Sequence, residues 1–140
     1  MRIWWLAFTV AVTLAIVVEP QTSRPVRVFE GARVIVGDGR AIDNAAFVVD
    51  GDTVTAVGPK RSVRVPAGAM RVDLTGKTVM PAAAAGFTRL GTLAAGKSAD
   101  SVVVDGNPLD DIRNTRRISH VYLRGEADDR AALKSRWSAD

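Results

Sequence analysis

Short apolar runs separated by tight turns make up most of the chain from Val26 to Met80. In the run 53–57, apolar and polar residues roughly alternate, which is the pattern of a half-buried strand. Asp50-Gly51-Asp52, just before this run, is a hairpin signal, because glycine accepts the positive φ that such a turn needs. The short, closely spaced runs predict an antiparallel meander or sandwich and not βαβ units. The predicted strands are 26–29, 33–36, 46–49, 53–57, 62–65, 70–74 and 77–80.

The strand pattern stops at Pro81 and resumes only after a break. Four alanines between Pro81 and Gly86 have no strand character, so residues 82–89 are predicted to be a linker. Two strands are predicted beyond it, at 101–104 and 118–123, with a loop or short helical turn between them. The expected organisation is a β-domain over 25–130 with halves 25–81 and 90–130, a short C-terminal helix over 128–137, and a tail over 131–140.

The N-terminus carries an uncharged run over residues 3–18, preceded by Arg2 and followed by Glu19. As a helix this run would span about 24 Å, which is short of the ~30 Å hydrocarbon core of a membrane. One positive charge before a short apolar run is the outline of a secretory signal. Residues 17–19 offer no A-x-A cleavage pattern, so an uncleaved anchor and a buried core helix stay open as alternatives. We therefore predict an apolar helix within residues 1–24 that acts as signal peptide or membrane anchor, and an exported (periplasmic or extracellular) or membrane-anchored protein.

Composition and charge narrow the classes of partner. Hydrophobic residues make up 47% and charged residues 24%, as in an ordinary folded domain. The net charge is +4, but the basic residues are scattered, and the one cluster, Arg113, Arg116 and Arg117, lies beside Asp110 and Asp111. A nucleic-acid interface would need a basic stripe with aromatic platforms, so no nucleic-acid partner is expected. The absence of cysteine excludes disulfides, thiolate zinc sites and cysteine nucleophiles.

Two stretches, 29–81 and 90–130, resemble the metal-dependent amidohydrolase superfamily, particularly its imidazolonepropionase-like and cytosine-deaminase-like members. The first contains the strand and turn Val79-Met80-Pro81. The second contains Gly91-Thr92-Leu93, then Gly96-Lys97-x-Ala99-Asp100 and a strand followed by Asp105-Gly106-Asn107-Pro108-Leu109. The resemblance implies a small antiparallel β-sandwich (the composite domain), built from the N- and C-terminal halves. It also implies hydrolysis of carbon–nitrogen bonds other than peptide bonds as the family activity.

In that family the catalytic barrel is inserted between the two halves. The barrel holds one or two divalent metals such as zinc, and the ligands are histidines, an acid or lysine, and a last Asp. Here the second half begins at Leu90, only a few residues after Pro81. Catalytic zinc sites usually take at least three protein ligands, and His120 is the sole histidine. We therefore predict no catalytic, cofactor-binding or metal-ligating residue and no cofactor, and we expect the chain alone to be inactive.

Other candidate groups have ordinary structural interpretations. His120 is expected on the surface or rim of its strand. Asp110 and Asp111 are adjacent, so they point in different directions, and acids suit the start of a helical turn. Asp100 and Asp105 bracket a strand as turn acceptors. The glycine loops 37–39 and 91–96 match neither a P-loop nor a dinucleotide fingerprint.

Three functions are compatible with the sequence. The first is a truncated amidohydrolase that keeps the sandwich and has no activity of its own. The second is an exported or anchored β-domain that self-associates or binds a protein through the surface that formerly met the barrel, with a membrane contact through residues 3–18. The third is a half-enzyme that works with a barrel supplied by another chain. The parent substrate stays unassigned, because specificity in such enzymes lies in the barrel loops.

Overall fold

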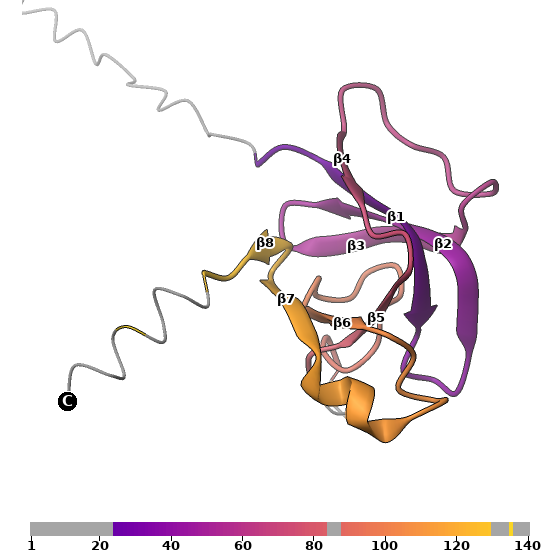
Figure 1. The fold of residues 1–140 in the computed structure, drawn as a ribbon. Coiled ribbons are helices and arrows are strands. Elements are labelled where there is room, and N and C mark those ends of the chain that lie inside the picture. Colours follow the sequence, from indigo (N-terminus) through magenta and orange to yellow (C-terminus); the bar gives the residue numbers. More distant parts are fainter. Residues whose placement is uncertain (1–23, 84–87, 130–134, 136–140) are drawn as a thin grey trace, which may run out of the picture.

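The valine-rich runs of the sequence form eight strands that belong to one mixed sheet (Figure 1). The structure is a computed structural model that describes residues 24–83, 88–129 and 135. The prediction of a mainly β chain is confirmed. The elements are β1 (Arg27–Ile35), β2 (Ala41–Asp50), β3 (Thr53–Pro59), β4 (Met70–Asp73), β5 (Lys77–Pro81), β6 (Ser101–Asp105), the 3-10 helix η1 (Ile112–Arg116), β7 (Ile118–Leu123) and β8 (Glu126–Ala127).

The first three strands form two antiparallel hairpins, β1–β2 and β2–β3. The turn at Gly51, with φ of 61°, joins β2 to β3 as the sequence predicts. The two runs predicted at 26–29 and 33–36 form one continuous strand, β1, with a register shift between Glu30 and Ala32. Gly31 lies at this irregularity with φ of 89°, a conformation that side-chain-bearing residues rarely adopt.

The prediction of a wholly antiparallel sandwich is wrong. β4 and β5 both pair with β1 in parallel, as in the partners Val28–Arg71 and Val34–Val79. The parallel direction arises because residues 60–69 carry the chain from the end of β3 back to the start of β1. These residues form no strand, so the strand predicted at 62–65 is also wrong, and Ser62 instead donates its N–H to the carbonyl of Pro59 at 2.9 Å.

The two halves of the chain meet where β5 pairs with β6 in antiparallel register, from Lys77–Asp105 to Pro81–Ser101. β7 then pairs with β6, and β8 with β7, which gives the order β3-β2-β1-β5-β6-β7-β8, with β4 beside β1. Sequence alone correctly expects both halves to share one β-structure, but the result is one open, mixed sheet and not two stacked sheets.

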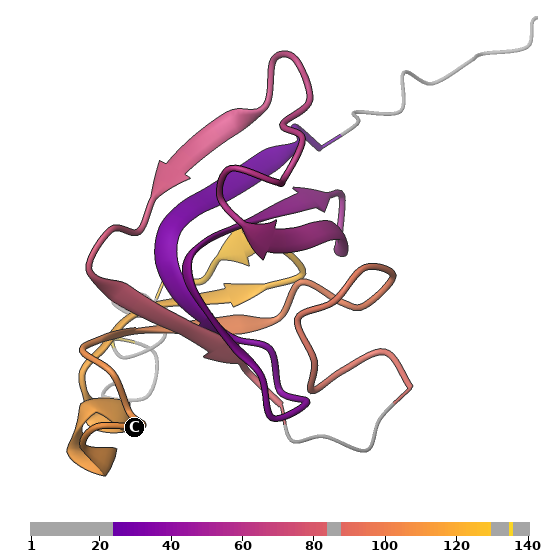
Figure 2. The same ribbon diagram turned by 90° about the vertical axis from the view of Figure 1, so that its right-hand side faces the viewer.

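The sheet curves so strongly that its first edge approaches the segment before β6 (Figure 2). Val54 donates its N–H to the carbonyl of Lys97, and Ala99 donates to the carbonyl of Asp52, both at 2.8 Å. The curvature encloses the main core, in which Phe29 stacks on Phe47 with ring centroids 4.7 Å apart and meets the edge of Tyr122 at 4.8 Å. Burial raises the pKa of the Tyr122 hydroxyl, as expected for a phenol in this core.

A second, smaller cluster covers the other face of the first hairpin. Val28, Ala46 and Val48 are buried there, against partly buried Val63 and Val65 from the 60–69 crossing. Residues 45–49 of β2 are consequently buried on both faces, which explains why this stretch of the sequence is apolar without alternation.

Two predictions fall wholly or mostly on residues outside those described. The apolar segment 3–18 lies there entirely, and of the predicted helix 128–137 only Asp128, Asp129 and Ser135 are described. Among the described residues, no helix has the length and hydropathy to cross a membrane.

Candidate functional site

A hollow lies where the two halves and their connection meet. It has a volume of about 950 Å³, and we call it the junction hollow. The residues that surround it come from the β2–β3 turn, from the segment between β5 and β6, and from the end of β7 and the β7–β8 turn. They are Asp52, Ala82, Ala83, Arg89, Leu90, Ser98, Asp100, Leu123 and Arg124.

Backbone contacts fix the geometry of this hollow. Asp100 accepts the N–H of Arg124 with Oδ1 at 2.8 Å and the N–H of Ala82 with its carbonyl at 3.1 Å. Arg124 has φ of 52°, which turns the β7–β8 hairpin sharply at this point. One aspartate therefore joins the departing chain, the returning chain and the last hairpin.

Charges of both signs line the hollow. Asp52 accepts the Thr53 hydroxyl at 2.7 Å, and this bond is the main reason that the pKa of Asp52 is lowered, with smaller contributions from the positive charges of Arg89 and Arg124. The two arginines balance Asp52 and Asp100, so the rim is close to neutral. Leu123 is 51% exposed and adds an apolar surface to this polar rim.

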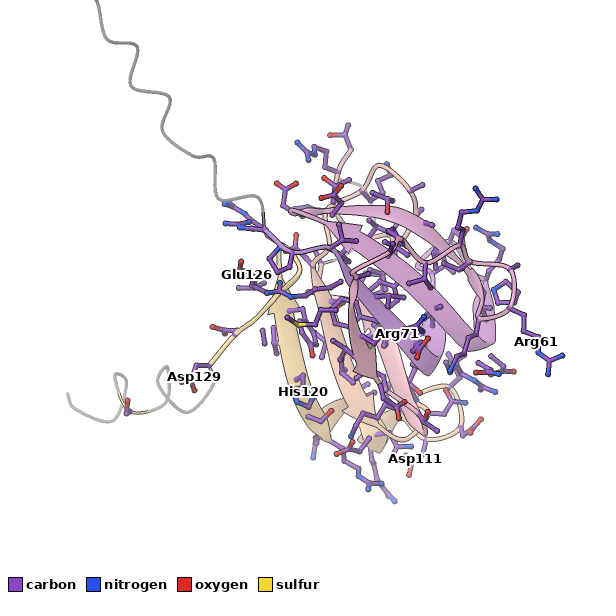
Figure 3. All side chains as sticks on the ribbon, turned by 90° about the horizontal axis from the view of Figure 1, so that it is seen from above. Arg61, Arg71, Asp111, His120, Glu126 and Asp129 are labelled. Carbon is purple, nitrogen blue, oxygen red and sulfur yellow. The ribbon has the colours of Figure 1, made fainter. Side chains whose placement is uncertain are left out.

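His120 lies on β7, exposed, as the sequence suggests (Figure 3). Its ring is 6.1 Å from that of Tyr122 in a stacked arrangement. Among the residues that the structure describes, no group of three or more histidines, aspartates or glutamates is placed to hold a metal ion. This donor set does not fit the zinc site that the family resemblance implies, because a single imidazole supplies one ligand where three are needed.

The acidic candidates take structural roles. Asp111 caps η1 by accepting the N–H of Arg113 at 2.9 Å, and Asp110 is exposed beside it. Asp100 accepts a turn N–H, in agreement with its interpretation as a turn acceptor. Asp105 differs from that interpretation, because its carboxylate binds the Lys77 ammonium at 2.5 Å across the β5–β6 pair.

The Lys77–Asp105 pair lies at the strand pairing that unites the halves. The hydrogen bond from Lys77 is the main cause that lowers the pKa of Asp105, and the lysine charge adds to it. Lys77 and Asp105 are direct cross-strand partners. The sequence alone did not predict the pair, because the register between two strands from different halves was not assigned. The available signal was a lysine at the start of the strand predicted at 77–80 and an aspartate directly after the strand predicted at 101–104.

A second, smaller hollow of about 300 Å³ lies near the far end of the same two strands, beside Arg33, Lys77 and Asn107. The amide nitrogen of Asn107 is buried and has no hydrogen-bond partner within the described part of the chain, while its Oδ1 accepts the N–H of Leu109 at 3.1 Å. A buried donor of this kind is normally satisfied by solvent or by a polar ligand.

Comparison with known proteins gives a partial likeness to hydrolases. No protein-family model matches the chain, and no curated protein matches it. A putative prolidase from Bifidobacterium longum aligns at 29% identity over 42% of this chain and 15% of its own length, with a TM-score of 0.39. A molinate hydrolase aligns at 20% identity over 42% of this chain and 13% of its own, with a TM-score of 0.38. A triazine hydrolase variant aligns at 24% identity over 41% and 13%, also with a TM-score of 0.38.

The chain therefore spans about a seventh of the length of these neighbours. Their names are those of hydrolytic enzymes, and the aligned region covers less than half of the present chain.

Proposed function

We propose that this chain is the β-domain of an amidohydrolase-type protein, without a catalytic centre of its own, and that it acts as a binding module. The pairing of Pro81 with Ser101 is the observation that carries the proposal. The chain leaves the sheet at Pro81 and returns at the neighbouring position, Ser101, after a connection much shorter than the roughly 250 residues of a (β/α)₈ barrel. The amidohydrolase resemblance of residues 29–81 and 90–130 implies that the family's barrel would be inserted at this connection.

The available side chains support a non-catalytic role. Metal-assisted hydrolysis requires an ion that polarises the scissile carbonyl and lowers the pKa of a bound water. His120 is the sole imidazole in the sequence, and there is no thiol. His120 is exposed on β7 and is not among the residues that line the junction hollow. Asp52 and Asp100 at the hollow are engaged by Thr53 and Arg124.

Metal analysis and hydrolysis assays test this proposal on the purified full chain. After incubation with zinc or manganese and removal of free ion, we expect far less than one metal per chain, and no turnover of a cyclic amide or a cyclic ureide. His120→Ala is the matched control, because it removes the sole imidazole that the chain can offer to a metal ion. Stoichiometric metal accompanied by turnover that His120→Ala abolishes would refute the proposal.

A second candidate is a half-enzyme that docks on a separate barrel, and the exposed Leu123 at the rim of the junction hollow favours it. The barrel-side partner would cover Leu123 and meet the balanced charges of Arg89, Arg124, Asp52 and Asp100. Mixing the chain with an amidohydrolase barrel that lacks its own β-domain should then restore hydrolysis. Leu123→Asp should reduce the restored rate at least about tenfold, since an interfacial leucine would be replaced by a buried charge.

We also propose that residues 3–18 export or anchor the chain. Fractionation of cells that express the full chain, with N-terminal sequencing of the product, distinguishes the outcomes. A cleaved product outside the cytoplasm indicates a signal peptide, and an intact product in the membrane fraction indicates an anchor. An intact product in the cytosolic fraction would contradict both.

A further inference from the structure

β4 presents an open edge of the sheet. Its one neighbour among the described strands is β1. Figure 2 shows β4 at the margin of the molecule, with β1 on its inner side. Met70 is 51% exposed, and Arg71 and Asp73 are exposed as well. An unpaired strand edge is a template for pairing with another strand.

The backbone groups that this edge offers can be assigned from the bonds that β4 makes to β1. Met70 donates its N–H to the carbonyl of Val26, and Leu74 donates to that of Glu30, each at 2.8 Å. In a parallel pair alternate residues bond to the same neighbour, so positions 70, 72 and 74 face β1. The N–H and C=O groups of Arg71 and Asp73 therefore point away from β1.

The two outward-facing residues carry opposite charges. Arg71 binds Glu30 with Nη1–Oε2 of 3.0 Å and remains 58% exposed, so part of its guanidinium is available to a further acceptor. Asp73 accepts the N–H and the hydroxyl of Thr75 with one oxygen, at 2.9 and 2.6 Å. These bonds lower the pKa of Asp73, which is accordingly ionised at neutral pH.

We propose that two copies of this chain associate through their β4 edges, in antiparallel register with Val72 on the two-fold axis. In this register Arg71 of each copy lies opposite Asp73 of the other. Each such pair exchanges two backbone hydrogen bonds and places opposite charges directly across the strands. The edge is thus complementary to itself, as an interface between identical subunits requires. The inference concerns assembly and does not depend on the proposed function.

Disulfide trapping tests the register. The chain has no cysteine, so a single introduced thiol reports one position. At a non-hydrogen-bonded antiparallel pair the Cα atoms are about 4.5 Å apart, which suits a disulfide, so Val72→Cys should form a covalent dimer on oxidation with diamide. Met70→Cys is the matched control, because residue 70 is exposed but would not meet its counterpart. In this register the two copies of residue 70 are separated by four residues along the strand, which is about 14 Å at about 3.4 Å per residue. We expect at least about tenfold faster cross-linking at position 72 than at position 70; equal rates, or no cross-link at 72, would overturn the proposal.

Charge reversal tests the complementarity without cysteine. Arg71→Asp creates an all-acidic edge and Asp73→Arg an all-basic edge, so each variant alone should lose association about tenfold or more. Mixed together, the two variants restore both opposite-charge pairs. Two differently tagged copies of the chain, kept in the same mild detergent, should therefore co-purify when one carries Arg71→Asp and the other Asp73→Arg. They should not co-purify when both copies carry the same substitution. Equal co-purification in all three samples, or its loss in the mixture, would contradict the β4 interface. Residues 1–23 are the same in every sample, so association through the N-terminal segment cannot produce the expected pattern.

Discussion

The first hairpin and the junction between the halves are stabilised in different ways. The β1–β2 hairpin is buried on both faces, by the Phe29–Phe47 core on one side and by the Val28 cluster on the other. The junction buries Val79 and Val103 in the main core and adds polar contacts to it: Lys77 with Asp105, Asp100 with the backbone of Arg124, and the β5–β6 hydrogen bonds. Apolar burial is proportional to the area removed from water, whereas half-exposed charge pairs contribute little.

The two regions are therefore expected to tolerate substitution to different degrees. A substitution in the hairpin core should destabilise both halves, because Tyr122 from β7 packs on Phe29 from β1. A substitution among the charges of the junction should leave the fold intact.

Phe29→Ala should have the largest effect. Phe29 is 1% exposed, and its removal deletes contacts with Phe47 and Tyr122 and leaves a cavity between the halves. We expect a loss of about 3–5 kcal/mol in the free energy of unfolding, measured by urea denaturation. Phe29→Leu keeps much of the volume and should cost clearly less. A loss below about 1 kcal/mol for Phe29→Ala would show that the two halves do not share this core.

Gly37→Ala should have an intermediate effect, through the backbone of the junction. Gly37 has φ of 97°, and a Cβ at this position would collide with the carbonyl oxygen of Gly91. The collision would disturb the nearby bond from the Leu93 N–H to the Val36 carbonyl, 2.8 Å long, which attaches the second half to the residue that follows β1. We expect a loss of about 2–4 kcal/mol, the sum of backbone strain and a forced shift.

Gly39→Ala is the matched control for this substitution. Gly39 has φ of 91° but no heavy atom within 4 Å of an added Cβ, so only the backbone strain applies. Its cost should be about 1–2 kcal/mol. Equal losses for the two alanine variants would mean that the Gly37–Gly91 contact does not contribute to joining the halves.

Local pattern predicted the hairpins because their determinants lie close together in the sequence. The turn at Gly51 and the alternation in 53–57 suffice to specify β2 and β3. The same reasoning failed at 62–65, where Val63 and Val65 pack on the small cluster without any strand to pair with. Local patterns indicate burial, but pairing depends on partners that the local sequence does not contain.

The parallel direction of β4 and β5 and the Lys77–Asp105 pair are long-range properties. Residues 77 and 105 come from different halves, and their register emerges only when β5 and β6 form. The candidate site shows the same limit. The sequence predicted His120 on a strand and Asp100 as a turn acceptor, as the structure has them. It did not predict that Asp52, Arg89 and Arg124 meet at one hollow.

Lys77→Met should have the smallest effect, and that effect should depend on pH. The folded-state pKa of Asp105 is lowered by Lys77, so the pair stabilises the fold above the ordinary aspartate pKa of about 3.9 and loses this contribution as pH falls through the folded value. Urea midpoints measured between about pH 6 and pH 2.5 should therefore decline less steeply for Lys77→Met than for the unmodified chain. Arg61→Met, which removes an exposed positive charge on the turn after β3, should leave the slope unchanged (Figure 3). Parallel slopes for all three proteins would show that the junction is held by its backbone pairing and apolar contacts, with no contribution from the Lys77–Asp105 charge pair.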